Sequence, residues 1–140
     1  ADIDYWSGCL SAIKSAAKVT DKTRAIIAGN AAGHPADWPA LRALADEHSL
    51  FLIEDSSEAI GSRHKAGIVG SFGDVALFDF AQPGVICCGE GGMIVTDDAT
   101  LAMTMRRMRA RTLGDRASVS AGVDAPFGAP MGELTAALAL

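Results

Sequence analysis

The chain has 140 residues, of which 49% are apolar and 21% charged, and its formal net charge at pH 7 is −5. This length suffices for one domain with a buried core, and the acidic balance argues against a nucleic-acid partner, because phosphate binding needs clustered Lys and Arg. The apolar runs are too short to span a bilayer, no secretory signal is visible, and the odd number of cysteines, three, suits a reducing compartment. We therefore expect one domain over residues 1–140 of a cytoplasmic protein with no membrane partner.

Helices and strands are predicted to alternate along the chain. The spacing of apolar residues and the capping residues predict helices at residues 5–17, 37–48, 97–111 and 131–140. Short apolar runs predict strands at residues 24–28, 50–53, 75–80 and 93–96, with a small hairpin at 63–69 and a loop at 112–130. This alternation predicts an α/β fold with a mostly parallel sheet flanked by helices.

Two of the predicted helices have a defined apolar face. In the first, the apolar residues at helical spacing are Trp6, Cys9, Leu10, Ile13 and Ala17. In the third, the residues expected inside are Leu101, Met105 and Met108, and those expected in solvent are Arg106, Arg107, Arg109 and Arg111. We interpret this arginine run as the solvent face of an amphipathic helix.

Asp55 is the first candidate for chemistry. It directly follows an apolar strand, so its carboxylate should lie at the carboxyl end of the sheet, half shielded from water. A carboxylate there can hold a cation or a protonated ring nitrogen. Asp55 alone leaves a second interpretation open, in which this acid caps a turn or a helix.

The cysteines and histidines lack the spacing of metal ligands, so no metal site is predicted.

Five sequence blocks surround Asp55 in a characteristic order. They are GHPAD at 33–37, IEDSSEAIG at 53–61, GSFGD at 70–74, GEGGMIVTDD at 89–98 and MGELTAAL at 131–138. In this order they resemble the DegT/DnrJ/StrS family of nucleotide-sugar aminotransferases, which use pyridoxal 5′-phosphate (PLP). The resemblance implies that the chain is the central part of the large domain of a PLP-dependent transferase of the aspartate-aminotransferase type.

The resemblance also implies roles for particular residues. Asp55 would pair with the pyridine nitrogen of PLP and keep it protonated, which makes the ring an electron sink. Ser57 would lie against the ring face, and Glu58 near the phenolic oxygen of the ring. The implied substrate is a keto-sugar nucleotide. A homodimer or a partner chain is implied too, because family enzymes build each site from two subunits.

Two positions depart from the family pattern. The family has Phe-Ser-Phe, three more residues and then the lysine that carries the cofactor, whereas here the lysine position falls on Gly84. Glycine has no amine, so it can neither join the cofactor nor transfer a proton. Asp79 stands where the family has a serine that donates to the cofactor phosphate, and a carboxylate there would repel that phosphate.

Three hypotheses about function remain after these departures. The chain is a member of the PLP-dependent sugar aminotransferase family that lacks normal transaminase activity. Alternatively, it is a non-catalytic binding or assembly module with the same fold. In the third hypothesis it is an enzyme that uses PLP or pyridoxamine phosphate without a lysine.

Overall fold

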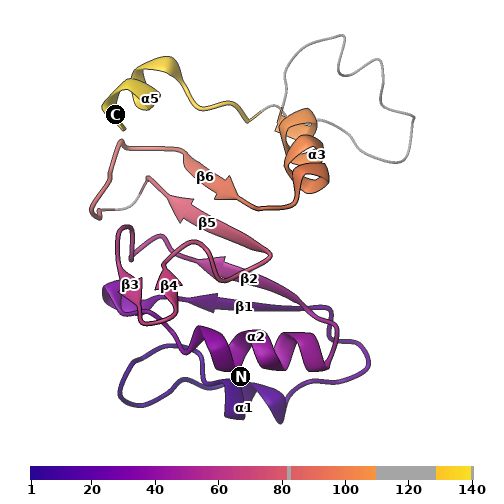
Figure 1. Cartoon of the computed structure of the whole chain (residues 1–140). Helices are drawn as coiled ribbons and strands as arrows, with labels where there is room; N and C mark the ends of the chain where they lie inside the picture. Colours follow the sequence, from indigo (N-terminus) through magenta and orange to yellow (C-terminus); the bar gives the residue numbers. More distant parts are fainter. Residues whose placement is uncertain (82, 110–128, 140) are drawn as a thin grey trace.

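The computed structural model describes residues 1–81, 83–109 and 129–139 (Figure 1). Its centre is a four-stranded sheet with the order β1-β2-β5-β6. The strands are β1 (Ala25–Gly29), β2 (Phe51–Asp55), β5 (Val75–Asp79) and β6 (Gly92–Val95). The first three are parallel and β6 is antiparallel to β5, so the predicted α/β fold with a mostly parallel sheet is confirmed.

Helices precede, connect and follow these strands. They are α1 (Ala12–Ala16), α2 (Trp38–Glu47), α3 (Ala99–Arg109) and α5 (Glu133–Leu138), with a short 3₁₀ turn η1 (Ala31–Gly33). The predicted hairpin is present as β3 (Arg63–His64) and β4 (Gly67–Ile68). None of the described helices combines the length and the apolar character that a membrane crossing needs.

Helix α2 connects β1 to β2 and supplies much of the core. It begins as predicted at Asp37, whose Oδ1 accepts a hydrogen bond from Ala40 N at 3.4 Å, and Pro39 lies in its first turn, where a missing N–H is tolerated. Trp38 and Leu41 of this helix are fully buried against the sheet. Burial of a leucine-sized side chain contributes about 1.5–3 kcal/mol, so this face of α2 holds β1 and β2 together.

The first part of the predicted helix at residues 5–17 is wrong, because the helix begins only at residue 12. Asp4 Oδ1 accepts hydrogen bonds from the backbone N–H groups of Trp6 and Ser7 and from the Ser7 hydroxyl, and Gly8 has a φ of +70°. These local bonds close a turn that competes with the helix. Trp6 is consequently 90% exposed, whereas Cys9 is buried as predicted.

The carboxyl-terminal part of the described chain agrees with the prediction in outline. In α3, Leu101, Met105 and Met108 are half-buried, and Arg106, Arg107 and Arg109 are exposed. Helix α5 is shorter at both ends than predicted. Arg111 and residues 112–128 of the predicted loop lie outside the described residues.

The two faces of the sheet differ in burial. Along β1 and β2 every second side chain faces α2 and is buried. Ile26 of β1 and Leu52 of β2 are examples. The residues between them face the other side, where Ile27 is 64% exposed and Ile94 of β6 is 53% exposed. Because Asp55 alternates with the buried Glu54, its side chain belongs to this open side.

Candidate functional site

The carboxyl ends of β1, β2 and β5 meet at one cavity of about 900 Å³. Its lining includes all five positions that sequence analysis placed at the site, namely Asp55, Ser57, Glu58, Asp79 and Gly84. Gly29 and the loop that follows β1 complete one wall. The parallel register, in which Gly29 pairs with Asp55 and Asp55 with Leu77, brings these strand ends to the same edge.

Asp55 is half-buried and is held by its near neighbour Ser57. Asp55 Oδ1 accepts a hydrogen bond from Ser57 N at 3.1 Å and from Ser57 Oγ at 2.7 Å. The Asp55 carbonyl oxygen accepts from Asn30 N at 3.0 Å, which ties this strand end to β1. Asp55 therefore presents a carboxylate in a defined place at the carboxyl end of the sheet.

Glu58 is exposed and stabilises the loop after β1. Its Oε2 accepts a hydrogen bond from Ala32 N at 2.7 Å, and Ala32 has a φ of +49°. A non-glycine residue in this left-handed region costs about 1–2 kcal/mol, and a hydrogen bond to a charged acceptor offsets part of that cost. Glu58 is thus at the cavity and is already engaged with the protein.

Asp79 and Gly84 form the opposite side of the cavity. Asp79 N donates to Ser57 Oγ at 3.0 Å, and Asp79 Oδ1 accepts from Ala81 N at 2.8 Å, where the chain leaves β5. Gly84 is exposed in the loop that follows.

The residues described around this cavity include three carboxylates and no Lys, Arg or His. This lining suits the nitrogen end of a pyridine ring and is unfavourable for a phosphate.

A buried polar network lies beneath the cavity, and sequence analysis missed it. Glu54 is fully buried and its carboxylate accepts four hydrogen bonds, from Asn30 Nδ2, Ser56 Oγ, Gly70 N and Phe72 N, at 2.7–3.1 Å. Asn30 Oδ1 accepts from Trp38 Nε1 at 2.8 Å and from Ala36 N at 3.0 Å.

The network joins β1, β2, α2 and the segment before β5. A charged residue at a buried position of the apolar β2 run is the sequence signal that could have revealed it. Because every one of these polar atoms has a partner, the network stabilises the strand ends on which the cavity is built.

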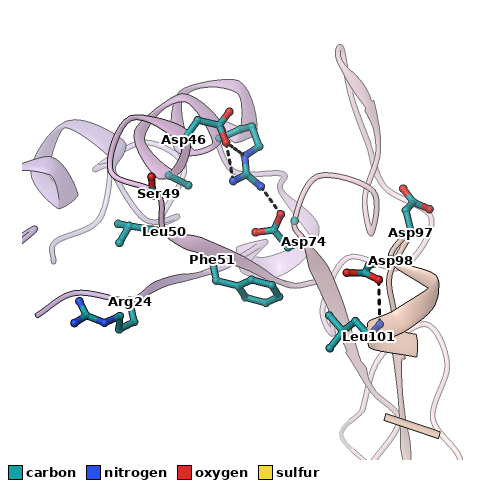
Figure 2. A pocket seen from close by; sticks show the side chains of 12 residues that line it. Arg24, Asp46, Ser49, Leu50, Phe51, Asp74, Asp97, Asp98 and Leu101 are labelled. Atoms are coloured by element: carbon teal, nitrogen blue, oxygen red, sulfur yellow. Dashed lines mark hydrogen bonds and ion pairs between the residues drawn. The ribbon is translucent and has the colours of Figure 1, made fainter. Parts of the chain in front are cut away.

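A second hollow, of about 760 Å³, lies at the opposite end of the sheet, where β2 and β5 begin (Figure 2). Arg42 contacts Asp46 at 2.9 Å and Asp74 at 3.0 Å, and Asp74 Oδ2 accepts from Leu52 N at 2.6 Å. These charges pair with one another and with the backbone. The hollow is therefore interpreted as a structural junction between α2 and the sheet.

Comparison with known proteins identifies the family. The sequence profile of the DegT/DnrJ/EryC1/StrS aminotransferase family matches residues 1–140. The chain belongs to this family. The resemblance inferred from the five sequence blocks is thereby confirmed.

Individual relatives agree with this assignment. The chain is 44% identical over 101 residues to GDP-perosamine synthase of Escherichia coli O157:H7, covering 72% of this chain and 27% of that protein. The crystal structure of DesI in the presence of its TDP-sugar product matches with a TM-score of 0.84 and 34% identity, over 99% of this chain and 35% of that one.

A dehydratase is also a structural neighbour. E. coli GDP-4-keto-6-deoxy-D-mannose-3-dehydratase with bound hydrated PLP matches with a TM-score of 0.70 and 29% identity, over 78% of this chain and 28% of that one. The chain thus spans about a quarter to a third of the length of these three proteins.

Proposed function

We propose that the cavity at the carboxyl ends of β1, β2 and β5 holds a vitamin B6 cofactor without a covalent bond. PLP is the cofactor that family membership implies, and its amine form is pyridoxamine 5′-phosphate. The single observation that carries the proposal is that Asp55 and Gly84 line the same cavity. Asp55 is the carboxylate that a protonated ring nitrogen requires. Gly84 stands where the family resemblance implies the lysine that joins the cofactor.

The residues of the cavity can hold the ring end of such a cofactor, and its phosphate would have to lie away from the three carboxylates. Asp55 would accept a hydrogen bond from the ring nitrogen, Ser57 would lie beside the ring, and Glu58 would face its phenolic oxygen. When bound, the cofactor supplies an electron sink for a carbanion next to an amine. Asp55 contributes to this chemistry by keeping the ring nitrogen protonated.

We further propose that the chain does not carry out ordinary transamination. This chemistry needs an amine that joins the cofactor and moves a proton, and the chain has four lysines, none of which is among the residues described around the cavity. Lys14, for example, donates to Asp2 and to the carbonyl oxygen of Ile3. The hydrogen bond from Lys14 lowers the pKa of Asp2 below its ordinary value, so this amine has a partner elsewhere.

Other aspects of the function rest on the relatives alone. We propose a nucleotide sugar as the ligand class, because the relatives include a GDP-perosamine synthase and a protein crystallised with a TDP-sugar product. A single domain over residues 1–140, a homodimer or partner chain, and a cytoplasmic location remain predictions from sequence analysis.

A second candidate function is a non-catalytic assembly module. The observation that favours it is the open face of the sheet, where Ile27 and Ile94 are largely exposed. Exposed apolar side chains on an uncovered sheet face are where a partner surface would pack. This candidate requires no cofactor, which separates it from the first proposal.

Titration of the protein with PLP, followed by absorption spectroscopy, borohydride treatment and intact mass, tests the proposal. We expect a saturable spectral change, no mass increase after borohydride, and loss of the change in Asp55→Ala. Asp46→Ala is the matched control, because Asp46 lies at the other end of the sheet. A mass increase by one cofactor that Asp55→Ala abolishes would show that an amine attaches the cofactor in this cavity and would contradict the proposal. The absence of any saturable change would favour the assembly module.

A further inference from the structure

Ser57 makes contacts that connect the ends of two adjacent strands. Its backbone N–H and its hydroxyl both donate to Asp55 Oδ1, at 3.1 and 2.7 Å, and its hydroxyl oxygen accepts from Asp79 N at 3.0 Å. Asp55 ends β2 and Asp79 ends β5. The Ser57 hydroxyl therefore bridges the two strands at the rim of the cavity.

The direction of these hydrogen bonds follows from the chemistry of the groups. A backbone N–H can only donate, so the Ser57 oxygen must accept from Asp79 N. A hydroxyl has one hydrogen, and the neighbouring acceptor that remains is the carboxylate of Asp55. The Ser57 hydroxyl is consequently engaged on both sides by the protein.

The two donors from Ser57 converge on the same oxygen of Asp55. Within residues 1–81, 83–109 and 129–139, no donor reaches the other oxygen, Oδ2. Two donors on Oδ1 restrict rotation of the carboxyl group, which otherwise turns freely about its terminal bond. Oδ2 is then the oxygen that can accept from a bound group.

We propose that Ser57 is a positioning residue that orients Asp55, so that Oδ2 accepts the hydrogen bond from the ring nitrogen of the cofactor. This inference rests on the proposed function, since it assigns a role within the same cavity. It goes beyond contact between Ser57 and the ring face, because Ser57 acts on the ring through Asp55. The bridge to Asp79 N makes the orientation depend on β5 as well as on β2.

The test uses pyridoxamine 5′-phosphate labelled with ¹⁵N in the ring, with binding and the ring-nitrogen resonance measured by titration and NMR. In the unaltered protein we expect a protonated ring nitrogen. Ser57→Ala should weaken binding about tenfold and lower the protonated fraction, because Asp55 is no longer held with Oδ2 directed at the ring nitrogen. Ser57→Thr keeps the hydroxyl and should stay within about threefold of the unaltered protein.

Ser62→Ala is the matched control, because it removes a hydroxyl that donates to Gly33 O at 2.9 Å, away from Asp55. It should change neither the affinity nor the resonance. If Ser57→Ala binds as the unaltered protein does, with the same ring-nitrogen signal, the positioning role is overturned.

A second measurement separates this inference from the proposed function. If the unaltered protein does not bind pyridoxamine 5′-phosphate, the proposed function fails, and the carboxyl ¹³C resonance of Asp55 in the free protein decides the role of Ser57. That resonance should shift in Ser57→Ala and remain unchanged in Ser62→Ala. An unchanged resonance in Ser57→Ala would overturn the inference independently of any cofactor.

Discussion

At the scale of single residues, the proposed lack of ordinary transamination rests on Gly84. We expect that Gly84→Lys alone does not restore transamination. The resemblance implies that Asp79 replaces a serine that donates a hydrogen bond to the cofactor phosphate, and a carboxylate there repels that phosphate. An amine-transfer assay with a keto-sugar nucleotide and an amino donor is the measurement. Appreciable turnover by this single variant would show that our interpretation of the site is wrong.

Glu54 is the residue on which the polar network depends. Glu54→Gln replaces one carboxylate oxygen by an NH₂ group that faces a backbone N–H of Gly70 or Phe72. Because two donors then oppose each other in a buried place, we expect the free energy of unfolding to fall by about 1–3 kcal/mol, as measured by chemical denaturation.

Glu58→Gln is the control for this loss. Glu58 is exposed and accepts a single hydrogen bond from Ala32 N, so the substitution should cost about 1 kcal/mol or less. Equal losses in the two variants would contradict the importance assigned to the buried network.

At the scale of secondary-structure elements, α2 is defined by its cap and by one buried face. Asp37→Ala removes the side-chain cap at Ala40 N, and we expect the free energy of unfolding to fall by about 1 kcal/mol. The exposed Asp21, which lies before β1, provides the control Asp21→Ala, with an expected change within about 0.5 kcal/mol. Thermal denaturation of the two variants measures the difference.

The elements that sequence analysis recovered are those whose signals are local. The short apolar run at residues 50–53 predicts strand β2, and the capping residue Asp37 predicts the start of helix α2. The amino-terminal helix was overextended because apolar spacing was weighed above the turn that Asp4 and Gly8 close. The sequence itself carries a signal for that turn, because an Asp with Ser and Gly three and four residues later favours such hydrogen bonds.

At the scale of the whole molecule, the two faces of the sheet should respond differently to truncation. Leu41→Ala opens a cavity between α2 and the sheet and should cost about 2–5 kcal/mol. Ile27→Ala on the open face should cost about 1 kcal/mol or less, because Ile27 is 64% exposed. Denaturant unfolding compares them. Equal costs would show that the open face is covered in solution, and would favour the assembly module.

The sequence by itself determined the class of fold, the places of the main strands and the family, together with Asp55 as the central candidate. These depend on patterns within a few residues and on motif order, which the chain carries whatever its tertiary contacts are. Only the tertiary structure decided that Asp55, Ser57, Asp79 and Gly84 share one cavity.

The tertiary structure also decided that β6 runs antiparallel to β5, that Asn30 pairs with Glu54, and that the Ser57 hydroxyl points to Asp55. The physical reason is that these features depend on residues far apart in the sequence. The β5–β6 pairs are 13 to 19 residues apart, Asn30 and Glu54 are 24 apart, and the Ser57 hydroxyl is oriented by Asp79 N, 22 residues away. Local spacing carries no information about them.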